Sequence, residues 1–146
     1  AGAYPFITTI CYEDAVAEQV IRHLQEAAYL VNVTNDAWFG ETAEPYQHMQ
    51  MAQMRALETG RYLVRATNTG VSGFVGPDGQ LRKMAPMFTT TTLTDSIVPM
   101  SGLTPYARLG DKGVFMLLAL WVACLYGVDK LRMAVMSGAN PVEDEE

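Results

Sequence analysis

Cys11 is the side chain whose place in the sequence best fits nucleophilic chemistry. It follows Phe6–Ile10, a short apolar and β-branched run that predicts a buried strand, and it precedes residues with helical spacing. Such a corner brings a side chain to the edge of a sheet, where the helix dipole favours a thiolate. Backbone N–H groups just after Cys11 would then stabilise a tetrahedral oxyanion. A small buried apolar thiol fits the same spacing equally well, so position alone leaves both interpretations open.

The residues near Cys11 in the sequence do not supply a complete catalytic set. Cysteine acyl transfer requires a base that activates the thiol and moves protons. Glu13 shares a face with Cys11 if the strand continues but not if a helix has begun, and one acid does not complete a triad. His23 and His48 stand alone without metal-site spacing, so each is more simply a hydrogen-bonded helix residue. We therefore expect no metal and no other cofactor.

The elements that would position these residues alternate between strands and helices. Asp14 offers an N-cap for a helix, and a strand over residues 29–33 follows that helix. A loop then carries Trp38 and Phe39, and a second helix begins near Pro45. Further strands are predicted over residues 61–67, 71–75, 80–84 and 89–98. This order predicts an α/β layered fold with mixed strand pairing at its end.

Composition limits the classes of protein to which the chain can belong. Its 146 residues are enough for one ordinary domain, and an apolar content of 49% supports a buried core. The formal net charge of −6 and the lack of a basic patch in the sequence argue against a nucleic-acid partner. Cys11 and Cys124 lie in very different settings, so we expect no disulfide between them.

Residues 113–128 form an uncharged apolar run near the C-terminus. A helix of this length spans about 24 Å, somewhat less than the bilayer hydrocarbon core of about 30 Å, but flanking lysines can reach the interface. A buried core helix is the alternative. We favour a membrane span because the run is apolar all round and follows the last predicted strand.

The membrane interpretation sets the predicted domain organisation. Residues 1–110 would form the α/β part, residues 111–132 the transmembrane helix with its flanks, and residues 133–146 an acidic, disordered tail. Lys130 and Arg132, just beyond the apolar run, would place the tail in the cytoplasm and the α/β part on the opposite side.

Six segments, taken in order, resemble the C-terminal part of the apolipoprotein N-acyltransferase family, bacterial inner-membrane enzymes of the nitrilase superfamily. They are Ile10-Cys11-Tyr12-Glu13, Asn32-Val33-Thr34-Asn35-Asp36-Ala37-Trp38-Phe39-Gly40, Pro45-Tyr46-Gln47-His48, Met54-Arg55-Ala56-Leu57-Glu58-Thr59-Gly60-Arg61, Arg65-Ala66-Thr67-Asn68-Thr69-Gly70 and Gly102-Leu103-Thr104-Pro105-Tyr106. The nucleophile segment alone is weak evidence, whereas the ordered series is highly specific. The resemblance covers roughly residues 5–128.

The resemblance implies the C-terminal half of a nitrilase-like α-β-β-α sandwich on the periplasmic side, followed by one transmembrane helix. It implies that Cys11 takes an acyl chain from a phospholipid as a thioester and passes it to the α-amino group of an apolipoprotein's lipid-modified N-terminal cysteine. Tyr12 would supply a backbone amide near the oxyanion, and Glu13 would support the site. Trp38 and Phe39 would meet lipid or substrate, although core packing explains them equally well.

The resemblance also exposes a gap in the catalytic set. The family's unit resembles a Glu-Lys-Cys triad whose Glu and Lys precede the cysteine strand, and the ten residues before Cys11 contain neither. Lys83, Lys112 and Lys130 match no catalytic position. We therefore expect this chain to be a fragment that is inactive alone and needs the missing N-terminal half. Arg65 and Asn68 would brace the site, although ordinary hydrogen bonds at a strand end explain them more simply.

Two other functions stay open. One is a soluble nitrilase-type amidase, against which the apolar run at residues 113–128 argues. The other is a catalytically inert, membrane-anchored remnant that binds lipid or a partner half. An unreactive, buried Cys11 would favour the remnant.

Overall fold

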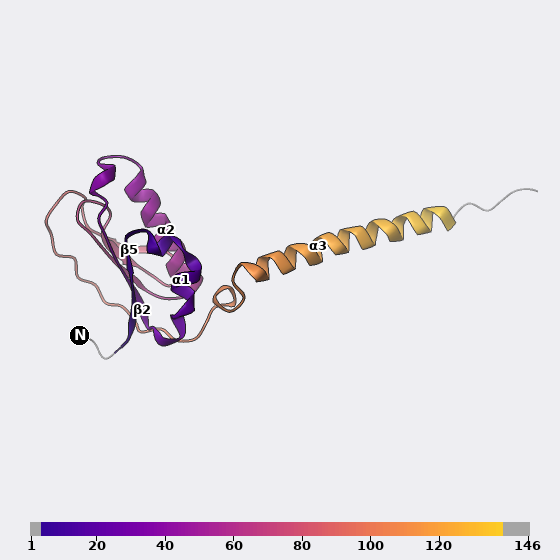
Figure 1. Cartoon of the computed structure of the whole chain (residues 1–146), viewed down its shortest axis with the longest axis horizontal. Helices are drawn as coiled ribbons and strands as arrows, with labels where there is room; N and C mark the ends of the chain where they lie inside the picture. The colour runs from indigo at the N-terminus through magenta and orange to yellow at the C-terminus, as the bar shows by residue number, and fades with distance from the viewer. Residues whose placement is uncertain (1–3, 139–146) are drawn as a thin grey trace, which may run out of the picture. The chain divides into compact units, whose positions relative to one another are not determined.

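The computed structural model describes residues 4–138. The chain divides into two compact units, with the boundary between Arg108 and Leu109. The first unit holds the strands and two helices of the described part, and the second holds most of one long helix (Figure 1).

The first unit is built on a five-stranded mixed sheet with the order β1-β2-β3-β4-β5. The strands are β1 (Phe6–Ile10), β2 (Tyr29–Thr34), β3 (Leu63–Thr67), β4 (Gly73–Val75) and β5 (Leu81–Met84). The first three are parallel, and β4 and β5 are added antiparallel. Because β1, β2 and β3 are parallel, their carboxyl ends lie at the same edge of the sheet. Parallel neighbours also need long crossover connections.

Helices α1 (Ala17–Arg22) and α2 (Glu44–Thr59) provide these crossovers and lie side by side (Figure 1). They share one apolar core with the sheet, whose buried members are Val20, Leu24, Leu30, Met49, Ala52, Ala56, Leu63, Val71, Val75 and Ala107. Helix α2 ends at Gly60, whose φ of +62° suits glycine and whose N–H caps the helix at Ala56 and Leu57. The predicted mixed α/β architecture is confirmed.

Two local predictions were wrong. Asp14 does not cap a helix: Cys11–Ala15 forms a short 3₁₀ helix, η1, and Val16 occupies the N-cap of α1. Asp14 is instead buried, because its carboxylate has charged partners inside the unit. The threonine-rich residues 89–98 do not form a strand, and most of their side chains are exposed. High β propensity needs packing against a neighbouring strand, which this segment does not have.

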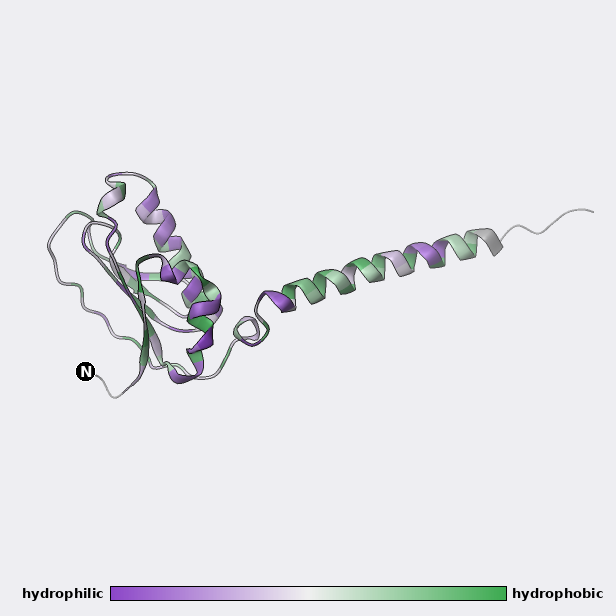
Figure 2. Cartoon of the chain, in the orientation of Figure 1, coloured by the Kyte–Doolittle hydropathy of each residue, from purple (hydrophilic) through white to green (hydrophobic). Residues whose placement is uncertain are grey.

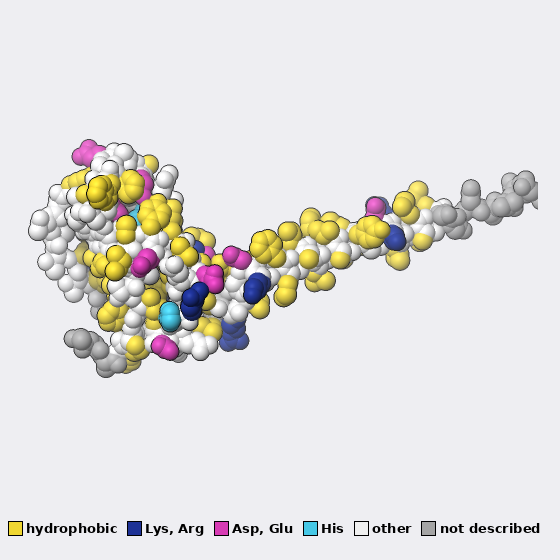
Figure 3. Space-filling view, viewed as in Figure 1, with side chains coloured by type: hydrophobic (Ala, Val, Ile, Leu, Met, Phe, Trp, Pro, Cys, Tyr) yellow, Lys and Arg dark blue, Asp and Glu magenta, His cyan; other side chains and the backbone are white. Residues whose placement is uncertain are grey.

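The long helix α3 (Pro105–Gly138) contains a break at Gly110, where φ is +56° and ψ is −156°. Its segment Pro105–Met136 is long and apolar enough to cross a membrane, with a mean hydropathy of 1.8 in its most apolar window. Within the described residues Phe115 is 68% exposed and Trp121 61%, which favours a membrane span over a buried core helix. Figure 2 shows the apolar run, and Figure 3 shows hydrophobic side chains exposed along it.

Helix α3 continues beyond residue 132, the predicted end of the transmembrane segment. Residues 133–138, assigned from the sequence to a disordered tail, continue α3, because apolar and helix-favouring residues persist beyond the charged group at 129–132. The rest of that predicted tail, residues 139–146, lies outside the described residues.

Candidate active site

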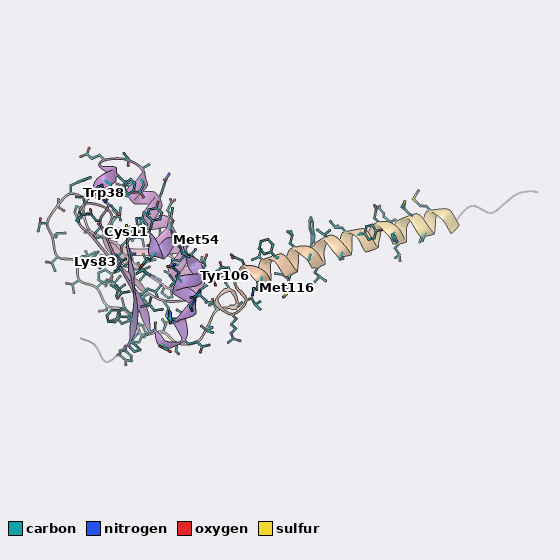
Figure 4. The ribbon with its side chains drawn as sticks, in the orientation of Figure 1. Cys11, Trp38, Met54, Lys83, Tyr106 and Met116 are labelled. Atoms are coloured by element: carbon teal, nitrogen blue, oxygen red, sulfur yellow. The ribbon has the colours of Figure 1, made fainter. Side chains whose placement is uncertain are left out.

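Cys11 occupies a strained turn at the carboxyl end of β1. Its φ is +52°, in the left-handed region that side chains other than glycine rarely adopt. Holding a residue there costs on the order of 1–3 kcal/mol and persists only where the surroundings fix it. The side chain is half-buried. Figure 4 labels Cys11 within the α/β unit.

Two side chains hold this turn, defined here as residues 10–14 and called the nucleophile turn because Cys11 is the candidate nucleophile. Glu13 folds back so that its Oε2 accepts a hydrogen bond from the Ile10 N–H at 2.8 Å. Asn32, from the neighbouring strand, donates through Nδ2 to the Cys11 carbonyl at 3.2 Å and to the Thr9 hydroxyl at 2.9 Å. Two backbone groups at the turn, the Ile10 N–H and the Cys11 carbonyl, therefore have side-chain hydrogen-bond partners, Glu13 and Asn32.

A buried charge cluster lies behind the turn. It consists of Asp14, Asp36, His48 and Arg65, each no more than 2% exposed. Arg65 donates to Asp14 Oδ2 at 2.9 Å, to Asp36 Oδ2 at 3.2 Å and to Asn32 Oδ1 at 2.7 Å. The cluster joins four parts of the fold, because Asp14 lies on η1, Asp36 just after β2, Arg65 on β3 and His48 on α2.

His48 completes the cluster from the opposite side of the carboxylates. Its Nε2 lies 3.0 Å from Asp14 Oδ1, and its Nδ1 lies 3.2 Å from Asp36 Oδ1. Burial lowers the pKa of His48, but the hydrogen bond to Asp14 and the charges of both carboxylates outweigh burial and the opposing charge of Arg65, so the pKa is raised above 6.5. When His48 is protonated, its imidazolium and the Arg65 guanidinium together balance the two carboxylates.

Tyr12 links the nucleophile turn to this histidine. Its ring stacks on the His48 ring with centroids 4.6 Å apart, and its hydroxyl donates to Glu44 Oε1 at 3.2 Å. Partial burial and the Glu44 carboxylate raise the pKa of the Tyr12 phenol above its usual value, so the hydroxyl stays protonated.

The loop that carries Trp38 starts from the same cluster. The short 3₁₀ helix η3 (Ala37–Phe39) follows Asp36 directly, and Trp38 is 83% exposed, which excludes core packing for that ring. Phe39 is half-buried. Asn68 holds the start of the loop, since its Oδ1 accepts from the Asp36 N–H at 3.2 Å and its Nδ2 donates to Asn35 at 2.6 Å.

Gly70 is required beside this loop because of a close approach. A Cβ at position 70 would lie 2.8 Å from the Cβ of Asp36, a separation that real side chains do not adopt. The segment Asn68-Thr69-Gly70 therefore packs its backbone directly against the charge cluster.

The structure brings together most residues that the sequence singled out. Cys11, Tyr12 and Glu13 share one turn, and Arg65 contacts Asp14 of that turn and Asn32, which fastens it. Asn68 contacts Asp36 and Asn35 at the start of the Trp38 loop instead. Arg65 binds two charged partners rather than making only ordinary strand-end contacts. Lys83 lies on β5, at the far side of the sheet from β1, and its Nζ donates to the Thr94 carbonyl.

Sequence reasoning missed the supporting roles of Asn32, Asp36 and Asp14, and it treated His48 as an isolated residue. The available signal was a polar residue at or just after each parallel strand, because those carboxyl ends converge at one edge. Within residues 4–138, no group of three or more His, Cys, Asp or Glu side chains could hold a metal ion.

Relatives of the chain support the resemblance seen in the motifs. The chain is 56% identical over 111 residues to the apolipoprotein N-acyltransferase of Methylococcus capsulatus, covering 76% of this chain and 22% of that protein. It is 49% identical to the one from Haemophilus influenzae, covering 80% and 23%, and 40% identical to the one from Photobacterium profundum, covering 99% and 28%.

The chain thus spans about a quarter of the length of these relatives. Residues 6–106, which include all the strands described here, match the carbon-nitrogen hydrolase family. The chain therefore belongs to the carbon-nitrogen hydrolase family.

Proposed function

We propose that this chain carries the nucleophile of an apolipoprotein N-acyltransferase, with Cys11 as the acyl-carrying residue. The observation that carries the proposal is the Cys11 turn: a half-buried thiol at φ +52°, fixed by Glu13 and Asn32. Strain of this kind is typical of residues held in place for chemistry rather than for packing. The names of the relatives point to the same reaction.

The proposed reaction has two steps. The Cys11 thiolate attacks an ester carbonyl of a phospholipid, a thioester forms, and the lysophospholipid leaves after its oxygen takes a proton. The α-amino group of the apolipoprotein's lipid-modified N-terminal cysteine then attacks the thioester, an amide forms, and the amine proton goes to the base while the thiolate is released. The Tyr12 backbone N–H would stabilise the oxyanion in both steps.

The general base lies outside the described residues in this proposal. Lys83 is held four strands away from β1, roughly 19 Å at about 4.8 Å per strand, so it does not reach Cys11. We assign the Glu and Lys of the triad to a preceding part of the full-length enzyme. Glu13 then acts by fixing the turn, since its carboxylate is bonded to the Ile10 N–H.

The proposed setting is the bacterial inner membrane. Helix α3 would anchor the catalytic part on the periplasmic face, with Lys130 and Arg132 favouring a cytoplasmic C-terminus. Trp38, fully available to a ligand, would contact the phospholipid donor or the apolipoprotein acceptor, with Phe39 supporting it from the half-buried side of the loop.

Acyl labelling of the full-length protein that contains this segment tests the proposal. With a phospholipid whose acyl chain is labelled, we expect a hydroxylamine-sensitive label that survives Cys124→Ser and disappears in Cys11→Ala. Cys124 is the matched control because it is the other free cysteine and lies on α3. A label that persists in Cys11→Ala would refute the assignment of the nucleophile.

The same experiment separates the two alternatives. A soluble-type amidase would release an amine or ammonia from an amide and show no acyl transfer to an apolipoprotein amine. An inert remnant would show neither label nor reaction of Cys11 with a thiol reagent. The half-buried thiol favours a reactive Cys11 over the remnant.

A further inference from the structure

His48 is the residue through which the nucleophile turn and the Trp38 loop are joined. It contacts two members of the turn, Tyr12 by ring stacking and Asp14 by a hydrogen bond. It also contacts Asp36, which immediately precedes the helical turn that carries Trp38. The side chain itself is fully buried and does not reach the surface at which substrate would bind.

We propose that His48, held between Asp14 and Asp36 and stacked beneath Tyr12, is a positioning residue that sets the Tyr12 backbone amide and the Trp38 loop in register with Cys11. The inference rests on the proposed acyl-transfer function. His48 does not exchange protons with substrate in this proposal, because both of its nitrogens are occupied.

The hydrogen bonds around His48 indicate which protonation state of its imidazole ring holds Asp14 and Asp36 together. Asp14 and Asp36 each use one carboxylate oxygen to accept from Arg65 and the other to face His48. Ionised carboxylates only accept, so both His48 nitrogens must donate, which requires the imidazolium. A neutral ring has one N–H, so one of its nitrogens faces a carboxylate oxygen without donating to it, although Asp36 Oδ1 still accepts from the Thr34 hydroxyl at 3.0 Å.

The groups that face His48 come from every element packed around it. Asp14 and Tyr12 approach from η1, Asp36 from the end of β2, and Arg65 from β3. Glu44, on the same helix as His48, acts one contact further away, through the Tyr12 hydroxyl. The two carboxylates and the stacked ring favour the positive ring, and Arg65 opposes it.

The position of Tyr12 matters because its backbone N–H follows the nucleophile directly. Small misplacement of a group that contacts the transition state lowers the rate steeply, by about a hundredfold for 1 Å. Loss of the His48 clamp frees the Tyr12 ring on one side and the Asp36 carboxylate on the other. The reaction rate should then fall although Cys11 and its strand remain.

The test is His48→Gln in the full-length protein, with single-turnover acylation of Cys11 by a labelled phospholipid. Glutamine carries two N–H donors on a single nitrogen and no positive charge, so it cannot supply the charged donor on each side that the imidazolium gives to Asp14 and Asp36. We expect the first-order acylation rate to fall ten- to a hundredfold, with the apparent KM for phospholipid changed less than twofold. His23→Gln is the matched control, since His23 is exposed and outside the cluster, and it should react at the wild-type rate.

A pH series separates positioning from a purely structural role. As pH rises, His48 loses its second proton, so the wild type also loses the positive charge that His48→Gln lacks. The ratio of the wild-type rate to the His48→Gln rate should therefore shrink towards one. A constant ratio at all pH values would overturn the proposal. So would an acylation rate for folded His48→Gln equal to that of the wild type.

Tyr12→Leu keeps the proposal testable if His48→Gln does not fold. Tyr12 is 45% exposed, so its loss should leave the melting temperature nearly unchanged. We expect a lower acylation rate in Tyr12→Leu, because residue 12 no longer stacks on His48. An unchanged acylation rate in Tyr12→Leu would overturn the positioning role of His48. A wild-type protein in which Cys11 takes no label would refute the proposed function instead.

Discussion

Replacing Arg65 by Met tests whether the buried charge cluster supports the fold as its geometry indicates. The side chain is fully buried and gives three hydrogen bonds to Asp14, Asp36 and Asn32. Methionine fills a similar volume but removes the guanidinium, so two buried carboxylates keep only His48 as a cationic partner. With His48 protonated, the net charge of the cluster changes from zero to −1.

The magnitude follows from the cost of an uncompensated buried charge. Removing one partner of a buried pair typically costs about 3–5 kcal/mol. At about 2–4 °C per kcal/mol for a domain of 150–250 residues, the melting temperature should fall by roughly 6–20 °C. Thermal unfolding of the full-length protein in detergent, followed by near-ultraviolet circular dichroism, measures this directly.

Arg82→Met provides the matched control. Arg82 pairs with Asp78 at 2.6 Å, a shorter contact than any that Arg65 makes, but both side chains of that pair are about half exposed. Solvent screens such a pair, so its loss should hardly move the melting temperature. The reasoning is refuted if Arg65→Met melts as close to the wild type as Arg82→Met does.

Three further predictions follow from the same region. Gly70→Ala should lower the melting temperature because its Cβ meets Asp36, whereas Gly127→Ala, with open space around it, should not; thermal unfolding compares them. The stabilisation from His48 should be complete below pH 6.5 and lost as pH rises through the raised pKa of the folded state, so the melting temperature should fall with pH in the wild type but not in His48→Gln. Trp38→Ala should keep the wild-type melting temperature but lower kcat/KM for acyl transfer, and equal kcat/KM would contradict a substrate contact at this ring.

The fold was predictable from the sequence where hydrophobic pattern and topology agree. The strand before Cys11, the helix from Pro45 and the stop at Gly60 all depend on local signals, and the structure has them. The predicted burial of that strand was wrong: only Thr9 of β1 is buried among the described residues, and Phe6 and Ile10 are exposed. Residues 89–98 were not predictable in this way. Their composition favours a strand, but a strand forms only where a neighbouring edge accepts its hydrogen bonds.

The candidate site was predictable only in part. Cys11, Tyr12 and Glu13 are adjacent in sequence, so a motif identifies them together. Asp14 and His48 are 34 positions apart, and their 3.0 Å contact exists because α2 packs against η1. A local pattern cannot contain that contact, and Asp14 therefore resembled a helix cap.

The strained turn and the charge cluster depend on one another energetically. A left-handed Cys11 costs on the order of 1–3 kcal/mol, and the turn would relax if nothing opposed it. Asp14, three residues later, is tied to both Arg65 and His48, and removing either partner costs several kcal/mol by the reasoning above. The energy that the ion pairs of the cluster contribute can therefore exceed the backbone strain at Cys11 and hold the turn in place. A buried ion network beside a nucleophile is in this case better explained by the geometry it enforces than by the net stability it adds, because an apolar core of equal volume would stabilise the domain at least as well without fixing Cys11.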